Sequence, residues 1–209
     1  MSHAPILVTG GAGYIGSHVV LQLLEQGERV IVLDNLNTGF AEAVIGAELV
    51  VGEVGDSALV EALLRQHGID TVMHFAARTI VPESVADPLR YYGNNTCATR
   101  NLLAACQQVG VKHVVFSSTA AVYGIPAAGR AAEADATQPI NPYGSSKLMS
   151  EGMLRDLSAA TSLRHVALRY FNVAGCDRAG RIGQSTEKAT LLVKVAAERC
   201  RLHPRLPKD

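Results

Sequence analysis

Three side chains with complementary chemistry stand close together in the sequence: Thr119, Tyr143 and Lys147. Tyr143 and Lys147 are four residues apart, so on a helix they share one face and can reach one site. A phenol has an ordinary pKa of about 10, and a nearby ammonium favours its ionised form. A Thr119 hydroxyl could relay a proton to that phenolate. The set fits hydride transfer at a carbinol carbon, whereas an exposed tyrosine and lysine on a helix is the alternative.

A glycine pattern provides a second chemical signal. Gly10, Gly13 and Gly16 form G-x-x-G-x-x-G between a strand-like run and a helix-like segment. Gly10 allows a sharp turn, Gly13 allows the backbone to approach a pyrophosphate, and Gly16 allows the helix to pack on the sheet. The helix N-terminus then favours the phosphate charge. The pattern predicts a dinucleotide site, and a glycine-rich turn without a ligand is the alternative.

The acidic residue that follows indicates which dinucleotide binds. Asp34 ends the next strand-like run, 18 residues after Gly16. A carboxylate at this place accepts hydrogen bonds from the adenosine ribose and repels a 2′-phosphate. No arginine follows among residues 35–38. We therefore expect NAD rather than NADP, although an acidic residue in an ordinary turn is the alternative.

Short β-branched runs alternate with helical patterns, which predicts the elements that position these residues. We expect strands at 6–8, 30–33, 49–51, 71–75, 113–116 and 166–168. Helices are expected at 14–26, 59–64, 89–109 and from Pro142 onward, with Asn141 as its N-cap. The alanine-rich stretch 127–136 is expected to be a surface loop. Continuous apolar strands between helices predict an α/β fold, a doubly wound parallel sheet with both faces covered.

Composition excludes several classes of protein. The chain has 209 residues, of which 48% are hydrophobic, and 19 basic residues balance 19 acidic ones. We therefore expect neither nucleic acid nor a membrane as a partner; binding of nucleic acid by the basic end, residues 199–205, is the alternative. Without a signal-like segment, a cytoplasmic location is expected. The cysteines are expected to be reduced and mostly buried, with no metal site: Cys97, Cys106, Cys176 and Cys200.

Six segments together carry a family resemblance. They are VTGGAGYIGSH at 8–18, LDNL at 33–36, HFAA at 74–77, SSTAAVYG at 117–124, NPYG at 141–144 and LRYFN at 168–172. The stretch from about residue 5 to 185 resembles the UDP-glucose 4-epimerases of the extended short-chain dehydrogenase/reductase group. The resemblance implies a Rossmann-type NAD-binding fold. It also implies interconversion of UDP-glucose and UDP-galactose by reversible hydride transfer at C4, through a 4-keto sugar.

The resemblance also implies roles for individual residues. Catalysis would fall to Thr119, Tyr143 and Lys147, with the cationic nicotinamide ring further favouring the phenolate, and Asn172 would join Thr119 and Tyr143 in binding the UDP-sugar. Ala120 and Ala121 replace the acidic pair of the 4,6-dehydratases, which disfavours dehydration. Glu53 stands where the family usually has aspartate. The residues implied to bind NAD are Gly10, Gly13, Tyr14, Ile15, Gly16, Asp34, Asn35, Asn37, Thr38, Glu53, Val54, Phe75, Ala76, Ala77, Asn94, Ser117, Tyr143, Lys147 and Tyr170.

The end of the sequence departs from the family pattern, because members continue well past this length with the residues that clamp UDP. We expect residues 1–180 to form the NAD-binding domain and 181–209 to be a remnant of a smaller C-terminal substrate domain with a basic tail. The isolated chain is then expected to bind NAD with little or no epimerase activity. A non-catalytic NAD-binding remnant or regulator, another sugar-nucleotide enzyme of the same group, and a homodimer all stay open.

Overall fold

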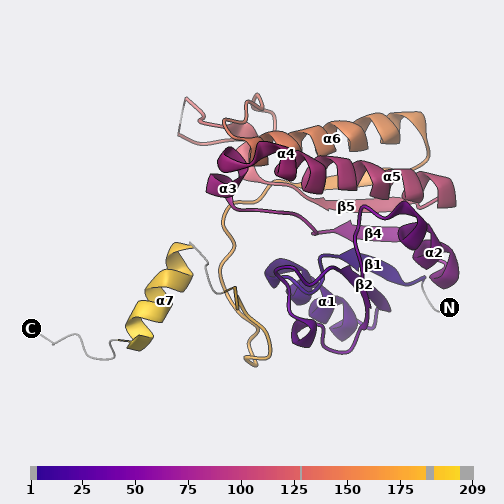
Figure 1. Ribbon diagram of the computed structural model, residues 1–209, viewed down its shortest axis with the longest axis horizontal. Coiled ribbons are helices and arrows are strands. Elements are labelled where there is room, and N and C mark those ends of the chain that lie inside the picture. The colour runs from indigo at the N-terminus through magenta and orange to yellow at the C-terminus, as the bar shows by residue number, and fades with distance from the viewer. Residues whose placement is uncertain (1–3, 128, 187–190, 203–209) are drawn as a thin grey trace, which may run out of the picture.

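The computed structural model describes residues 4–127, 129–186 and 191–202. Its centre is a six-stranded sheet in which every neighbouring pair is parallel, in the order β3-β2-β1-β4-β5-β6 (Figure 1). The strands are β1 (Ile6–Thr9), β2 (Val30–Asp34), β3 (Glu48–Val51), β4 (Thr71–His74), β5 (His113–Ser117) and β6 (Arg164–Leu168). All six lie where the sequence predicts strands, and the order reverses direction between β1 and β4, which confirms the doubly wound α/β fold.

The helices connect these strands and cover the sheet. They are α1 (Tyr14–Glu25), α2 (Ser57–His67), α3 (Val81–Ala86), α4 (Pro88–Tyr91), α5 (Ala98–Val109), α6 (Pro142–Ala160) and α7 (Leu192–Leu202). A π-helical segment spans Tyr92–Cys97, and 3₁₀ turns span Ala41–Ala43 and Ala120–Tyr123. The predicted helix over 89–109 is therefore three consecutive elements. The described part of the stretch 127–136 holds no helix, as expected for a loop.

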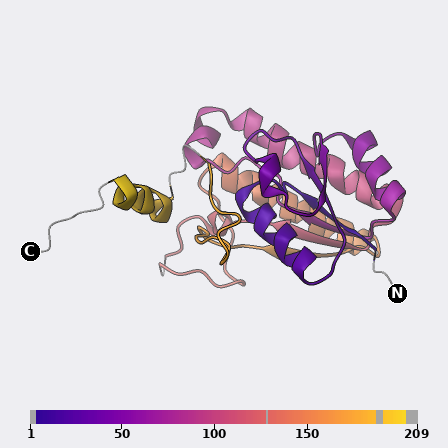
Figure 2. The same cartoon turned by 90° about the horizontal axis from the view of Figure 1, so that it is seen from below.

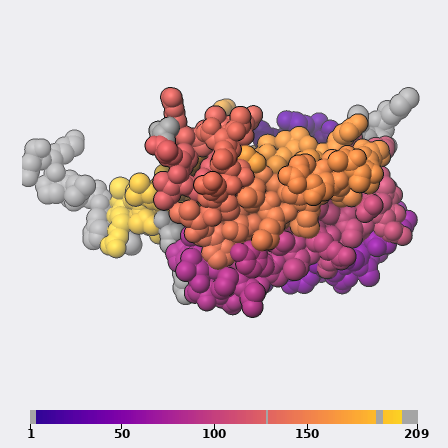
Figure 3. Space-filling view, turned by 90° about the horizontal axis from the view of Figure 1, so that it is seen from above, coloured from indigo at the N-terminus to yellow at the C-terminus, as the bar shows by residue number. Residues whose placement is uncertain are grey.

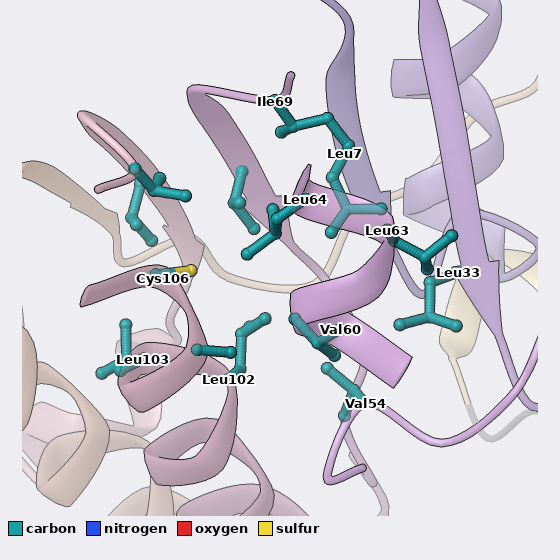
Figure 4. Close-up of a cluster of buried hydrophobic side chains, with 14 of the residues drawn as sticks. Leu7, Leu33, Val54, Val60, Leu63, Leu64, Ile69, Leu102, Leu103 and Cys106 are labelled. Atoms are coloured by element: carbon teal, nitrogen blue, oxygen red, sulfur yellow. The ribbon is translucent and has the colours of Figure 1, made fainter. Parts of the chain in front are cut away.

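Helices α2, α5 and α6 form one layer, in which α5 packs against both others, and α1 lies on the opposite face of the sheet (Figures 1 and 2). Seen from above, the orange surface that includes α6 and the segments drawn in magenta lie side by side along the molecule (Figure 3). The larger core lies beneath it, where Leu7, Leu64 and Leu102 are fully buried between α2, α5 and the strands (Figure 4). Each such side chain contributes about 1.5–3 kcal/mol to the free energy of folding.

Local sequence signals explain where the helix that carries the candidate catalytic pair begins. The Asn141 side chain accepts a hydrogen bond from the Gly144 N–H at 2.9 Å, and Pro142 occupies the first helical position. The cap satisfies an N–H group that has no partner within the helix, and the proline ring fixes a helical φ. These two residues therefore place Tyr143 in the first turn, as the sequence predicts.

Two expectations about burial are wrong. Three cysteines, Cys97, Cys176 and Cys200, are exposed, and of the four only Cys106, on the core face of α5, is buried. All four are free thiols, as expected. The sheet is also not covered on both faces throughout, since Val166 and Leu168 of β6 are 55% and 41% exposed. No helix in the described ranges is long and apolar enough to cross a membrane.

Candidate active site

A cavity of about 630 Å³ opens at the carboxyl ends of the strands, beside the loops that follow β1 and β4. Ligands of doubly wound folds bind at this place, where the strand order reverses. Every site residue that the sequence and the resemblance indicate lines this one cavity. They are Gly10, Gly13, Tyr14, Ile15, Gly16, Asp34, Asn35, Asn37, Thr38, Glu53, Val54, Phe75, Ala76, Ala77, Asn94, Ser117, Thr119, Tyr143, Lys147, Tyr170 and Asn172.

Gly10 and Gly16 have no room for a side chain, because other backbone atoms lie where a Cβ would stand. A Cβ on Gly10 would stand 2.4 Å from the Ala76 nitrogen, and Gly10 has a φ of +71°. A Cβ on Gly16 would stand 2.1 Å from the Gly10 oxygen. Helix α1 begins directly after Gly13, whose position as N-cap carries no side-chain hydrogen bond. The first turn therefore presents backbone N–H groups to the cavity, which suits an anion.

Asp34 joins the glycine loop to the end of β2. Its Oδ2 accepts from the Ala12 N–H at 3.0 Å, and its Oδ1 accepts from the Leu36 N–H at 2.8 Å. A carboxylate has about four acceptor positions, so capacity for ribose hydroxyls is left after these two bonds. Asp34 is 8% exposed at the cavity wall. Asp34 thus holds the backbone at Ala12 and Leu36, a role that the sequence did not reveal, in addition to the ribose contact that the sequence predicts.

Glu53 stands at the same end of the cavity. Its two carboxylate oxygens accept hydrogen bonds from the Asn35 side-chain nitrogen at 3.1 and 3.2 Å. The extra methylene of glutamate, compared with the aspartate usual in the family, is therefore accommodated by a contact between two side chains that line the cavity. Both were predicted as cofactor-binding residues, and their mutual contact shapes that wall.

The pair on α6 faces the ends of β5 and β6. Lys147 is 2% exposed, its Nζ donates to the Ser117 carbonyl at 2.8 Å, and it lies 4.8 Å from the centroid of the Phe116 ring. The hydroxyls of Ser117 and Tyr170 are hydrogen-bonded to each other. Thr119, the second residue after β5, accepts from the Ala121 N–H at 3.1 Å and so caps the 3₁₀ turn. The carboxyl ends of two strands and the first turns of α6 thus converge on one place.

The ionisation of Tyr143 in the protein alone is governed by burial. Burial raises the pKa of the Tyr143 phenol, and a hydrogen bond with Thr119 opposes this rise. Burial also lowers the pKa of Lys147 to about 7. In the cofactor-free protein Lys147 is desolvated and directed to the Ser117 carbonyl, so lowering of the phenol pKa by the ammonium together with the nicotinamide ring stays a prediction.

Sequence reasoning missed several residues of the cavity, among them Arg78, Gln184 and Thr186. Arg78 is the one arginine lining the cavity in the described ranges, and its Nη1 lies 3.7 Å from Oε2 of Glu83. Asn94 and Asn95 accept from the Arg78 N–H at 3.2 and 2.9 Å and hold this loop in place. The only available signal was the position of Arg78 shortly after β4, since no spacing rule predicts an arginine there.

These features match a dinucleotide in chemistry. The glycine loop leaves no room for a Cβ at Gly10 or Gly16, its helix start presents unpaired donors, and a carboxylate ends β2. The Thr119, Tyr143 and Lys147 side chains line the same cavity as Asp34. In the described residues, no cluster of three or more His, Cys, Asp or Glu side chains could hold a metal ion. Fold and site thus define a Rossmann-type dinucleotide-binding domain with a Thr-Tyr-Lys set.

Comparison with known proteins gives the family. Residues 6–202 match the model of the NAD dependent epimerase/dehydratase family, and the chain belongs to this family. It is 55% identical over 194 residues to a UDP-glucose 4-epimerase of Azospirillum brasilense. The alignment covers 92% of this chain and 56% of that protein. The resemblance that the sequence motifs indicate is therefore confirmed.

Two solved structures show the same fold. The UDP-glucose 4-epimerase of Brucella ovis in complex with NAD has a TM-score of 0.90 at 43% identity, over 93% of this chain and 60% of that one. The enzyme of Bifidobacterium longum in complex with NAD⁺ and UDP has a TM-score of 0.83 at 39% identity, over 88% and 58%. The chain thus spans about 56–60% of the length of these relatives.

Proposed function

We propose that this chain binds NAD and takes part in C4 epimerisation of a UDP-hexose, interconverting UDP-glucose and UDP-galactose. The observation that carries the proposal is the convergence of all predicted cofactor residues and of Thr119, Tyr143 and Lys147 on one cavity. The named activity of the relatives and the NAD in the Brucella ovis structure support it. NAD in this cavity would supply a hydride acceptor and donor for C4.

The side chains of this chain would manage the proton. Tyr143 removes the proton from the O4 hydroxyl as C4 loses its hydride, which gives a 4-keto sugar, and returns the proton when the hydride comes back to the other face. Thr119 hydrogen-bonds the same oxygen, so that this one proton reaches Tyr143 through or beside the Thr119 hydroxyl. The raised pKa of Tyr143 in the protein alone means that the phenol is protonated at neutral pH. Base function therefore requires the positive charge of the oxidised cofactor beside it.

The remaining residues would hold the two ligands. Residues of the glycine loop hold the pyrophosphate, Asp34 the adenosine ribose, Lys147 the nicotinamide ribose, and Asn172 the phosphate of the UDP-sugar. Ala120 and Ala121 line the cavity beside Thr119 and offer no acid for dehydration. The domain boundary at residue 180, the cytoplasmic location, the homodimer and the little or no epimerase activity expected of this chain stay predictions.

The direct experiment is incubation of the purified chain with NAD and UDP-galactose, with UDP-glucose measured by chromatography. Because little or no turnover is expected, the protein is used at a concentration comparable to that of the sugar nucleotide. Formation of UDP-glucose that depends on NAD and is lost in Tyr143→Phe supports the proposal. Efficient turnover would contradict the little or no activity expected of the isolated chain, and NAD binding without any UDP-glucose would favour a non-catalytic NAD-binding protein.

A further inference from the structure

A partly buried ion pair joins α6 to the residue that follows β6, about two helical turns beyond Tyr143. Arg169 Nη2 donates to Glu151 Oε2 at 2.6 Å, and Arg169 Nε donates to Oε1 and Oε2 at 3.0 and 3.1 Å. The side chains of Arg169 and Glu151 are only 25% and 10% exposed. Planar, bidentate pairs of this kind fix orientation as well as distance. The pair therefore restrains α6 against β6.

The same carboxylate also reaches β5. The Ser118 hydroxyl donates to Oε1 of Glu151. Ser118 stands between Ser117, whose carbonyl accepts from Lys147, and Thr119. Glu151 of α6 thus bonds the residues that follow β5 and β6, and one of these residues, Ser118, is next to Thr119.

Arg169 restrains the turn that follows. Its Nη1 donates to the Tyr123 hydroxyl at 3.0 Å, and its guanidinium lies 4.9 Å from the centroid of the Tyr123 ring. Tyr123 ends the 3₁₀ turn whose first N–H groups Thr119 caps. Glu151 and Arg169 therefore contact every segment that brings Thr119 and Tyr143 together: α6, the end of β5, the 3₁₀ turn and the end of β6.

The spacing on α6 explains how one element does this. Tyr143, Lys147 and Glu151 follow one another at intervals of four residues, so they lie along one face of the helix. Buried charges cost free energy unless they are paired and fully hydrogen-bonded, and apolar residues of similar volume would pack α6 equally well. An ion pair at this position is thus poorly explained by packing alone, whereas its directional bonds suit a positioning task.

We propose that Glu151 and Arg169 are positioning residues that set the separation of the Thr119 hydroxyl from the Tyr143 phenol. Neither side chain lines the cavity, so both act through other residues. Their effect on turnover rests on the function proposed above, whereas their effect on the Tyr143 phenol does not.

The test uses the full chain with ¹³C at the Cζ atom of its tyrosines. The Tyr143 resonance is identified as the one lost in Tyr143→Phe. Glu151→Gln keeps the shape and removes the charge, so we expect the Tyr143 resonance to shift as its contact with Thr119 changes. Where epimerase activity is measured, kcat should fall by about 10²-fold while KM changes less than about twofold. The rise of kcat/KM with pH should move to higher pH, because the Thr119 contact holds the phenol pKa down.

Two further variants make the test decisive. Asp156→Asn is the matched control, because it breaks an exposed pair with Arg155 on the same helix, where the side chains are 71% and 74% exposed. It should leave resonance and kcat unchanged. Arg169→Lys keeps a positive charge beside Glu151 but cannot bond Glu151 and Tyr123 at once. It should therefore shift the Tyr143 resonance, though less than Glu151→Gln does. If Glu151→Gln does not fold, the result for Arg169→Lys decides alone.

Loss of stability with an unchanged Tyr143 resonance in Glu151→Gln and Arg169→Lys would overturn the proposal and leave a structural ion pair. A shifted resonance in a chain without any epimerase activity would instead support the positioning role and favour a non-catalytic NAD-binding protein over the proposed function.

Discussion

The Nζ atom of Lys147 donates a hydrogen bond to the backbone carbonyl of Ser117 at 2.8 Å, in a site where the lysine is 2% exposed. This bond ties the candidate catalytic helix α6 to the end of β5. It also means that a lysine is held out of water with one neutral acceptor, which has a measurable consequence for stability.

The first prediction concerns the pH dependence of folding. Burial lowers the pKa of Lys147 to about 7 from the ordinary 10.5. Between these values the unfolded chain holds the proton and the folded chain does not, so the free energy of unfolding contributed by Lys147 rises with pH, by at most about 1.4 kcal/mol for each pH unit. Denaturant unfolding of the cofactor-free protein from pH 7 to 10 should show this rise. Lys147→Met should lack it, and parallel pH profiles for the two proteins would refute the shift.

The second prediction separates chemistry from cofactor binding. Tyr143→Phe removes the proposed base while the ring still packs, so NAD affinity should stay within about twofold and turnover should fall by at least about 10²-fold. Titration calorimetry with NAD and the chromatographic assay with UDP-galactose measure the two quantities. Full activity in the phenylalanine variant would exclude Tyr143 as the base.

The third prediction concerns cofactor choice. The Asp34 carboxylate lines the cavity and would repel the 2′-phosphate of NADP, and no arginine follows among residues 35–38 to bind that phosphate. Calorimetry should therefore show tighter binding of NAD than of NADP. Asp34→Arg should weaken NAD binding and lower stability, because the bonds to the Ala12 and Leu36 N–H groups are lost as well. Asp56→Asn is the control, since it alters a carboxylate that caps α2 away from the cavity. Equal affinities for NAD and NADP would contradict the assignment.

The fourth prediction concerns the glycine loop. Gly16→Ala would place a Cβ 2.1 Å from the Gly10 oxygen, so the loop must shift. We expect a loss of about 1–3 kcal/mol in the free energy of unfolding and at least tenfold (about 1.4 kcal/mol) weaker NAD binding. Gly152→Ala on α6 meets no atom within 4 Å and should stabilise by about 0.5–1 kcal/mol. Unchanged NAD affinity in Gly16→Ala would mean that the loop does not hold the cofactor.

The sequence predicts those parts of the site that depend on short-range rules. Gly10, Gly13 and Gly16, the Asn141 cap and the Tyr143–Lys147 spacing each follow from the geometry of one turn or one helix, and all reach the one cavity. The pairing of Glu151 with Arg169 could not be predicted, because it depends on how α6 lies against β6. The π-helical segment Tyr92–Cys97 was missed because hydrophobic periodicity does not distinguish it from an α-helix.

The most direct test of the central claim follows the hydrogen on C4. UDP-galactose carrying deuterium at C4 is incubated with NAD and a concentration of the chain comparable to that of the sugar nucleotide. If a hydride leaves C4 and the same hydride returns, the UDP-glucose formed carries deuterium at C4, and Tyr143→Phe forms none. UDP-glucose with solvent hydrogen at C4 would contradict the account.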